Sequence, residues 1–260
     1  MQRLRPGAGW PACLLLLACA QAGAALEVGI AYVGERTGSA WSGARQGLEE
    51  ARLQGEFLGQ QYALTEQAAA ATAIVAALPT TELLALAARY PDKPVLSIAN
   101  GDVAARKACR PNLLFLQPDS EMLAAGVRQW QSKHPADEVK ASAWHAGFEK
   151  YAASQLNHRY AEAFGEPMDD NAWGGWAAVK LLSDTVARLQ SAQDRDLLAA
   201  LRGDVAFDGQ KGYELSFRSD GQLRQPVLLS RGENLAGEAP VRGVADSLDS
   251  LGTSHCPPAP

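Results

Sequence analysis

The sequence predicts an α/β fold in which a parallel β-sheet is covered by helices on both faces. From residue 28 to residue 131, short apolar runs rich in β-formers alternate with segments of helical periodicity. Such alternation is typical of a parallel sheet, because a parallel connection needs a crossover that is usually a helix. After His134 the pattern changes to longer helices followed by a strand–turn–strand. This change predicts a second part with a different architecture.

The first strand, Val28–Val33, is a short apolar run that reads as a buried strand. A loop at 34–41 follows, and a helix is expected from Ser42 until Gly55 stops it. A second helix is expected after Pro79, with Thr80 as its N-cap. The remaining predicted strands of this half are 61–64, 73–78, 94–99 and 112–116, and its last helix is 120–131.

The second half is predicted to contain helices at 146–164, 171–190 and 196–202. In the longest of these, Trp176, Val179 and Leu182 recur at helical spacing and form a core stripe. Two strands at 213–217 and 222–230 surround Ser-Asp-Gly at 219–221, which is a hairpin signal. Residues 232–260 are rich in Gly, Pro and Ser and are expected to form an extended tail.

Residues 1–24 have the layout of a signal peptide. Arg3 and Arg5 precede an apolar run at 12–22, and Ala22-Gly23-Ala24 supplies a small-residue cleavage site. The run is about half of the ~20 residues that span a bilayer. We therefore expect export to the periplasm. A buried core helix is one alternative, and a lipoprotein anchored through Cys19 in Leu-Leu-Ala-Cys is another.

Removing residues 1–24 takes away Arg3 and Arg5 and no acidic residue, so the formal net charge moves from −5 to −7. An acidic chain does not favour nucleic-acid or anionic-membrane binding. Cys109 and Cys256 remain, and an even pair in an oxidising compartment predicts a disulfide. The alternative is two unrelated free thiols.

No catalytic constellation is visible, so we expect a non-enzymatic protein. The sequence lacks a Gly-x-Ser-x-Gly elbow, a phosphate loop ending in Gly-Lys-Ser/Thr, a Gly-x-Gly-x-x-Gly after the first strand and a Cys-x-x-Cys pair. No two of the four histidines have metal-ligand spacing, so no metal or cofactor is expected. Trp144, Trp173 and Trp176 are read as core packing, with the wall of a ligand cleft as the alternative.

Several segments resemble the branched-chain amino-acid type of periplasmic binding protein, the type I receptor fold. They are Val28–Val33 with the helix Ser42–Ala51, and the run Phe207–Phe217 followed by Asp220-Gly221-Gln222. More specifically, Ser216–Leu229 and the ending Leu248–Cys256 resemble the putative ABC-transporter substrate-binding proteins associated with alcohol dehydrogenases that use pyrroloquinoline quinone (PQQ).

The resemblance implies a two-lobe, periplasmic solute-binding protein that docks on an ABC permease, in a system linked to PQQ-dependent alcohol oxidation. The chain departs from that pattern between Gln131 and Ser142, where the strands of the second lobe would lie. We therefore expect one complete α/β lobe at 25–131, a reduced second lobe of helices and a hairpin at 132–231, and a tail at 232–260. The alternative is an interaction or scaffold protein that has lost ligand binding with its second lobe.

Ligands of open parallel sheets bind outside the carboxyl ends of the strands. The loops expected there carry the candidate ligand-binding residues, which related receptors also use. Helix N-termini at these loops offer free N–H groups to a carboxylate, and hydroxyl and amide side chains add hydrogen bonds. Simple helix capping is the alternative role for these side chains. The candidates are Ser39, Trp41, Thr80, Thr81 and Asn100.

Overall fold

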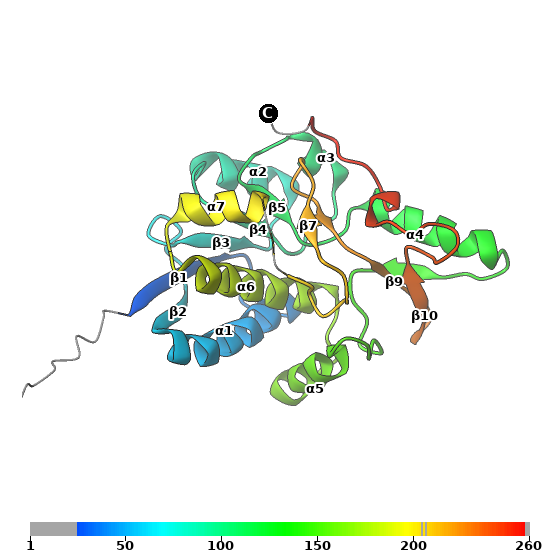
Figure 1. Cartoon of the computed structure of the whole chain (residues 1–260), viewed down its shortest axis with the longest axis horizontal. Coiled ribbons are helices and arrows are strands. Elements are labelled where there is room, and N and C mark those ends of the chain that lie inside the picture. The colour runs from blue at the N-terminus through cyan, green and yellow to red at the C-terminus, as the bar shows by residue number, and fades with distance from the viewer. Residues whose placement is uncertain (1–24, 204, 206, 258–260) are drawn as a thin grey trace, which may run out of the picture.

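The structure, a computed structural model, describes residues 25–203, 205 and 207–257, so the predicted signal peptide lies outside it. Its elements follow one another along the chain as Figure 1 shows. They are β1 (Leu26–Val33), α1 (Ser39–Leu58), β2 (Gln60–Thr65), β3 (Ala73–Ala76), α2 (Thr80–Arg89), β4 (Val95–Ser97), α3 (Val103–Lys107), β5 (Leu113–Phe115), α4 (Ser120–Lys133), β6 (Lys140–Ser142), α5 (Ala153–Phe164), α6 (Asp170–Leu189), α7 (Asp194–Arg202), β7 (Ser216–Phe217), β8 (Leu223–Arg224), β9 (Val227–Arg231), β10 (Asn234–Ala239) and a 3-10 turn at Leu248–Ser250.

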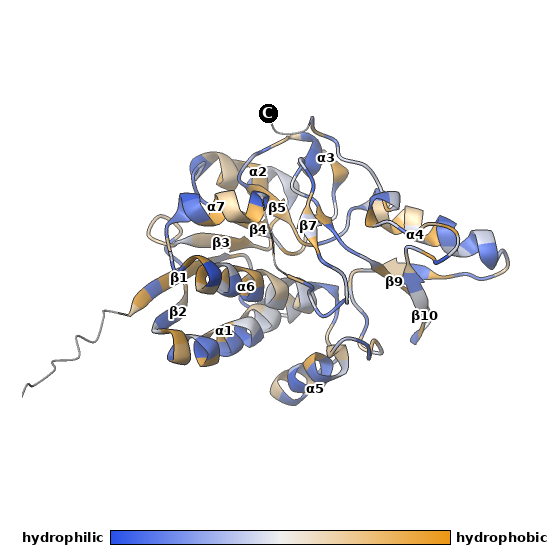
Figure 2. Cartoon of the chain, in the orientation of Figure 1, coloured by the Kyte–Doolittle hydropathy of each residue, from blue (hydrophilic) through white to orange (hydrophobic). Residues whose placement is uncertain are grey.

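The first five strands form one parallel sheet in the order β2-β1-β3-β4-β5. Successive side chains of a strand point to opposite faces. In β3, Ala73 and Val75 join the core on one face, whereas Ile74 and Ala76 join the core on the other. Both faces are therefore buried, which is why these strands read as continuous apolar runs. In Figure 2 the central strands accordingly carry mostly hydrophobic colours.

Helices α1 and α6 cover one face of this sheet, and α2 and α3 cover the other. Glycines let α1 and α6 approach each other closely. A Cβ added at Gly43 would lie 1.9 Å from the carbonyl oxygen of Ala172, and one at Gly175 would lie 2.2 Å from that of Ala40. Helix α6 thus completes the core of the N-terminal sheet although 111 residues lie between the end of α1 and the start of α6. We call β1–β5 with α1, α2, α3, α6 and α7 the parallel-sheet region.

A second sheet is antiparallel, in the order β10-β9-β6. Helix α4 packs on one of its faces, where Met122, Ala125, Val227 and Leu229 are buried together. We call β6, β9, β10 and α4 the antiparallel-sheet region. The short hairpin β7–β8 lies apart from this sheet and is joined to β5 through a bridge between Phe115 and Gln222.

The expected α/β class with a parallel sheet is confirmed, while several details differ from the sequence expectation. Helix α4, placed with the first lobe, packs on the second sheet, and α6, placed with the second lobe, packs on α1. The expected extended tail contains β10, which pairs with β9 and so satisfies its backbone groups. The helix expected from residue 146 begins at Ala153, because Tyr151 and Ala152 have positive φ angles of 53° and 67°.

A buried lysine lies where the two regions meet. The Lys211 side chain is fully buried, and its Nζ donates hydrogen bonds to the carbonyl of Ala143 and to Oε1 of Gln225, both at 2.6 Å. The same nitrogen lies 3.9 Å from the centre of the Trp173 ring. Burial lowers the pKa of Lys211 to about 7, against the opposing attraction of Asp170.

None of the helices in the described part of the chain is both long enough and apolar enough to cross a bilayer.

Candidate functional site

A hollow of about 720 Å³ opens at the carboxyl ends of β1 and β3. This is the edge of a parallel sheet where ligands of such folds bind. Two loops supply most of its wall, the one between β1 and α1 and the one between β3 and α2. The lining residues are Tyr32, Gly34, Glu35, Thr37, Gly38, Ser39, Ala40, Ala77, Leu78, Pro79, Glu82 and Asn171.

The N-terminus of α1 forms one end of the hollow. The helix begins at Ser39, three residues before the predicted start, and its N-cap is Gly38 with φ 77°. No side chain caps this end, and its first turn holds no acidic residue. The first backbone N–H groups of a helix have no partner inside the helix and carry the positive end of its dipole. This end of the hollow therefore offers hydrogen-bond donors to an oxygen acceptor or an anion.

Ser39 is the predicted ligand residue that lines the hollow. Its hydroxyl donates a hydrogen bond of 2.8 Å to Oδ2 of Asp169, which is the N-cap of α6. Asp169 also accepts a hydrogen bond from the Ala172 N–H. Because the Ser39 proton is directed to Asp169, the hydroxyl presents its oxygen lone pairs to the hollow.

Trp41 lies beside the hollow and is not part of its lining. The early start of α1 places this residue in the first helical turn, whereas the sequence suggested a loop. Its ring contacts the edge of the Tyr32 ring, with centroids 4.9 Å apart, and the Arg36 guanidinium lies 5.2 Å from its centre. Trp41 thereby supports Tyr32, which does line the hollow.

Thr80, Thr81 and Asn100 are not among the lining residues. Thr80 was expected to cap α2, but Pro79 occupies the N-cap position and the Thr80 hydroxyl donates to Asp102 at 2.8 Å. Thr81 is exposed. The Asn100 side chain is 6% exposed and donates to the Leu78 carbonyl and to Thr80.

Arg106 accounts for the burial of Asn100. Asn100 Oδ1 accepts hydrogen bonds from the Asp102 N–H and from the Arg106 guanidinium. That guanidinium is fully buried, stacks over the Phe115 ring at 3.9 Å and donates to Gln222 and to the Gln117 carbonyl. Burial lowers the pKa of Arg106 to about 10. Asn100 is therefore committed to a structural network behind the hollow.

The predicted site residues did not include five other polar side chains that line the hollow, Tyr32, Glu35, Thr37, Glu82 and Asn171. Burial raises the pKa of Tyr32 to about 12, so its hydroxyl keeps its proton and donates to the Glu35 carbonyl. Glu35 and Glu82 are exposed carboxylates at the rim. Asn171 comes from the start of α6, about 130 residues after the first loop, so no local pattern links it to the site.

The comparisons with known proteins support the fold. An ABC-transporter substrate-binding protein from Desulfitobacterium hafniense superimposes with a TM-score of 0.68 at 11% identity, over 82% of this chain and 99% of that one. A branched-chain amino-acid ABC-transporter periplasmic ligand-binding protein from Burkholderia xenovorans gives 0.67 at 10% identity, over 87% and 96%. A solute-binding protein from R. palustris in complex with benzoate gives 0.64 at 12% identity, over 83% and 96%.

No protein-family model and no curated protein sequence matches this chain significantly. At such low identity the structural likeness establishes the fold alone. The chain has the type I periplasmic-binding-protein fold, and it is structurally similar to substrate-binding proteins of ABC transporters.

Proposed function

We propose that this protein is the solute-binding component of an ABC transport system and that its ligand occupies the hollow between β1, β3 and α1. The observation that carries the proposal is the uncapped N-terminus of α1, which opens into a hollow of about 720 Å³ at the ligand-binding edge of a parallel sheet. Pockets of this size suit small molecules. The fold likeness to solute-binding proteins supports the same function.

The polarity of the hollow favours a small solute with two different ends. Free N–H groups at Ser39 and Ala40 suit an oxygen acceptor such as a carboxylate. Glu35 and Glu82 at the rim suit a donor or a cation. An amino acid or a hydroxylated organic acid has this combination. One matching structure is described as a complex with Leu and another as a complex with benzoate.

The test is a thermal-shift screen of the mature protein with amino acids, organic acids, alcohols and PQQ. A ligand that binds the native state alone raises the melting temperature. The Ser39 hydroxyl can accept a hydrogen bond from a donor group of the solute, such as a hydroxyl or an ammonium, so Ser39→Ala is expected to weaken binding about 5–10-fold, the cost of roughly one hydrogen bond. Thr81→Ala removes the same kind of hydroxyl from an exposed residue outside the hollow and should leave affinity unchanged. No shift with any compound would contradict the proposal.

The link to PQQ-dependent alcohol oxidation is a finer part of this proposal. It is supported by the resemblance of the segments 216–229 and 248–256 to binding proteins of such systems. It predicts that an alcohol, its oxidation product or PQQ gives the largest thermal shift. It also predicts that the export signal at residues 1–24 delivers the protein to the periplasm, which fractionation of cells would test.

The second candidate function is that of a scaffold protein without a ligand. The antiparallel sheet favours this function, because it has three strands whereas the parallel sheet has five. The second region is thus the smaller of the two, as in a receptor whose second lobe is reduced. This function predicts a flat thermal-shift screen together with co-purification of an ABC permease or a PQQ-dependent dehydrogenase. A solute that binds in an Ser39-dependent manner would exclude it.

A further inference from the structure

The described chain crosses between the parallel-sheet and antiparallel-sheet regions three times, between β5 and α4, between β6 and α6, and between β8 and β9. A fourth connection comes from the C-terminal segment. Cys256 forms a disulfide with Cys109, which follows α3 in the parallel-sheet region. Figure 1 shows the red C-terminal segment running from the antiparallel sheet past α4 to α3. We call residues 247–257 the C-terminal clamp.

One end of the clamp is anchored in the antiparallel-sheet region. Leu251 is fully buried in the cluster that joins α4 to β9 and β10. The Gln129 amide of α4 donates to the carbonyl and hydroxyl oxygens of Ser250, at 3.2 and 3.0 Å. Just before the clamp, the Val241 N–H donates to the Gln129 side chain. This end therefore moves with α4.

The other end is anchored in the parallel-sheet region through the β7–β8 hairpin as well as through Cys109. The His255 N–H donates to the buried Asp220 carboxylate at 2.9 Å, and the Ser219 hydroxyl donates to the Cys256 carbonyl at 2.8 Å. The hairpin is itself held to β5, because the Phe115 N–H donates to the Gly221 carbonyl and Arg202 donates to the Ser219 carbonyl.

Arg218 ties the hairpin to the middle of the clamp. Its side chain is 3% exposed, and its guanidinium donates to the carbonyls of Leu248 and Leu251. Asp249 of the clamp lies 3.8 Å from Arg218 and 2.8 Å from Arg224. A buried guanidinium without these acceptors would be left uncompensated, so the clamp is held in place by charge as well as by the covalent bond.

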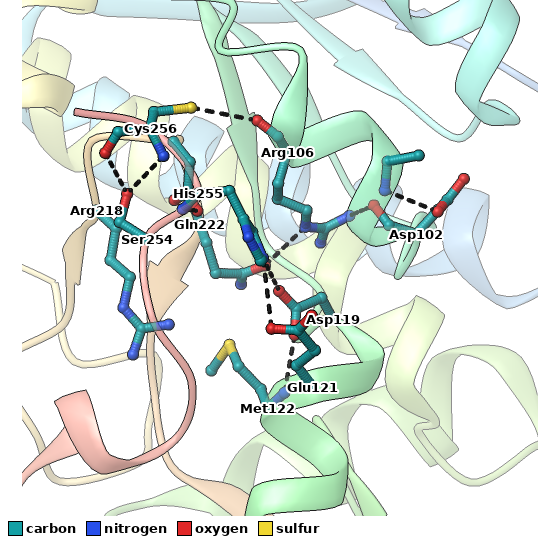
Figure 3. A network of polar contacts seen from close by, with 12 residues as sticks. Asp102, Arg106, Asp119, Glu121, Met122, Arg218, Gln222, Ser254, His255 and Cys256 are labelled. Carbon is teal, nitrogen blue, oxygen red and sulfur yellow. Dashed lines mark hydrogen bonds and ion pairs between the residues drawn. The ribbon is translucent and has the colours of Figure 1, made fainter.

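The clamp also contacts the connection between β5 and α4, which is the first of the three crossings between the regions. Figure 3 shows the His255 ring directed toward the N-terminus of α4. Its Nε2 lies 3.9 Å from Asp119 Oδ2 and 3.6 Å from Glu121 Oε2. Asp119 is the N-cap of α4 and is bonded to the Met122 N–H, so it lies at the point where a hinge between β5 and α4 would have to bend.

From these contacts we infer that the C-terminal clamp, fastened by Cys109–Cys256, holds the antiparallel-sheet region at a fixed angle to the parallel-sheet region. Five residues lead from the buried Leu251 to the cross-linked Cys256, and five residues span at most about 18 Å when fully extended. A hinge rotation would therefore pull on both anchors at once. On the proposed function, solute binds to an already formed hollow without a closing motion of the two regions.

The test measures the angle between the regions without any ligand, so it is independent of the solute screen. Spin labels are attached through an unnatural amino acid, which leaves the cysteines intact, at the exposed positions Glu56 in α1 and Glu233 between β9 and β10. Double electron–electron resonance then reports the distribution of distances. The disulfide-bonded protein is expected to give one narrow distribution, and Cys109→Ser/Cys256→Ser a broader one.

Ile74→Val is the matched control, because Ile74 is a core residue of the parallel sheet outside the clamp. It is expected to lower stability and to keep the narrow distribution. A broad or two-peaked distribution in the intact protein would overturn the inference, whether or not the serine variant folds. An equally narrow distribution in the folded serine variant would overturn it as well.

Discussion

Each of the two sheet regions is stabilised in a different way. In the parallel-sheet region, α1 and α6 touch backbone to backbone at Gly43 and Gly175, and buried side chains alternate on both faces of the sheet. The antiparallel-sheet region has one helix, a sheet of three strands and a cluster that includes Leu251 from the end of the chain. The first region is built mainly from close packing, whereas the second depends on a segment that is cross-linked to the first.

Breaking the cross-link should have the largest effect. Replacing Cys109 and Cys256 by serine opens a loop with a sequence separation of 147 residues. In the chain-entropy account a loop of this length stabilises the fold by up to about 5 kcal/mol. We expect a loss of that order in urea unfolding. Hydrogen exchange should rise more in α4, β9 and β10 than in β1 to β4, and a uniform rise across both regions would contradict the comparison.

The second-largest effect is expected when a methyl group is added at a helix contact, and the loss of stability should differ between the two regions. In Gly43→Ala the new Cβ meets the backbone oxygen of Ala172, so α1 and α6 must move apart, and we expect a loss of about 3 kcal/mol. In Gly126→Ala, on α4, the new Cβ meets the side-chain Cγ2 of Val227 at 2.5 Å. A side chain yields more easily than a backbone, so about 1 kcal/mol is expected. Equal losses in chemical denaturation would show that both regions pack alike.

The buried Lys211 at the junction between the regions should make the free energy of unfolding depend on pH. The folded-state pKa of Lys211 is lowered to about 7 from an ordinary value of 10.5, so the unfolded chain binds more protons between these values. Stability should therefore rise with pH from 7 to 9, with a limiting slope of about 1.4 kcal/mol per pH unit. The gain is complete above 10.5 and lost as the pH falls toward 7. Lys211→Met should flatten this rise in urea titrations, and an unchanged slope would contradict the assignment.

The smallest effect is expected at the network behind the hollow. Thr80→Val removes the hydroxyl that donates to Asp102 and accepts from Asn100, at a cost of about 0.5–1 kcal/mol. Hydrogen bonds from the Ala104 N–H and, second, from the Thr80 hydroxyl keep the pKa of Asp102 low, so that pKa should rise in the variant, which carbon-detected NMR can follow. Affinity for a solute found in the screen should stay the same. A loss as large as that of Ser39→Ala would place Thr80 in the site.

Local patterns predicted the parallel-sheet region well, because each of its elements carries its own signal. The apolar runs around Ile30, Ile74 and Leu114 became strands that are buried on both faces. Strand β10 was missed because Ala236, Gly237 and Glu238 have little strand preference, and pairing with β9 stabilises them instead.

The site was predicted less well than the fold. The loop after β1, which the sequence placed at the ligand-binding edge of the sheet, lines the hollow, and Ser39 is among its lining residues. Thr80 and Asn100 lie at the expected edge of the sheet, yet their polar atoms are used within the protein. Sequence position does not reveal whether a polar side chain faces a ligand or a buried arginine such as Arg106. Asn171 was missed because only the tertiary packing of α6 brings it to the loop.

The placement of α6 also fixes an order of events during synthesis. The face of the N-terminal sheet that α6 covers stays open until residue 189 has left the ribosome. The antiparallel strands β9 and β10 are made later still, and the Cys109 thiol has no disulfide partner until residue 256 has been made. The strands that are made first are therefore among the last to have their apolar face covered. A chain interrupted before residue 170 would expose that face and be a substrate for chaperones and proteases.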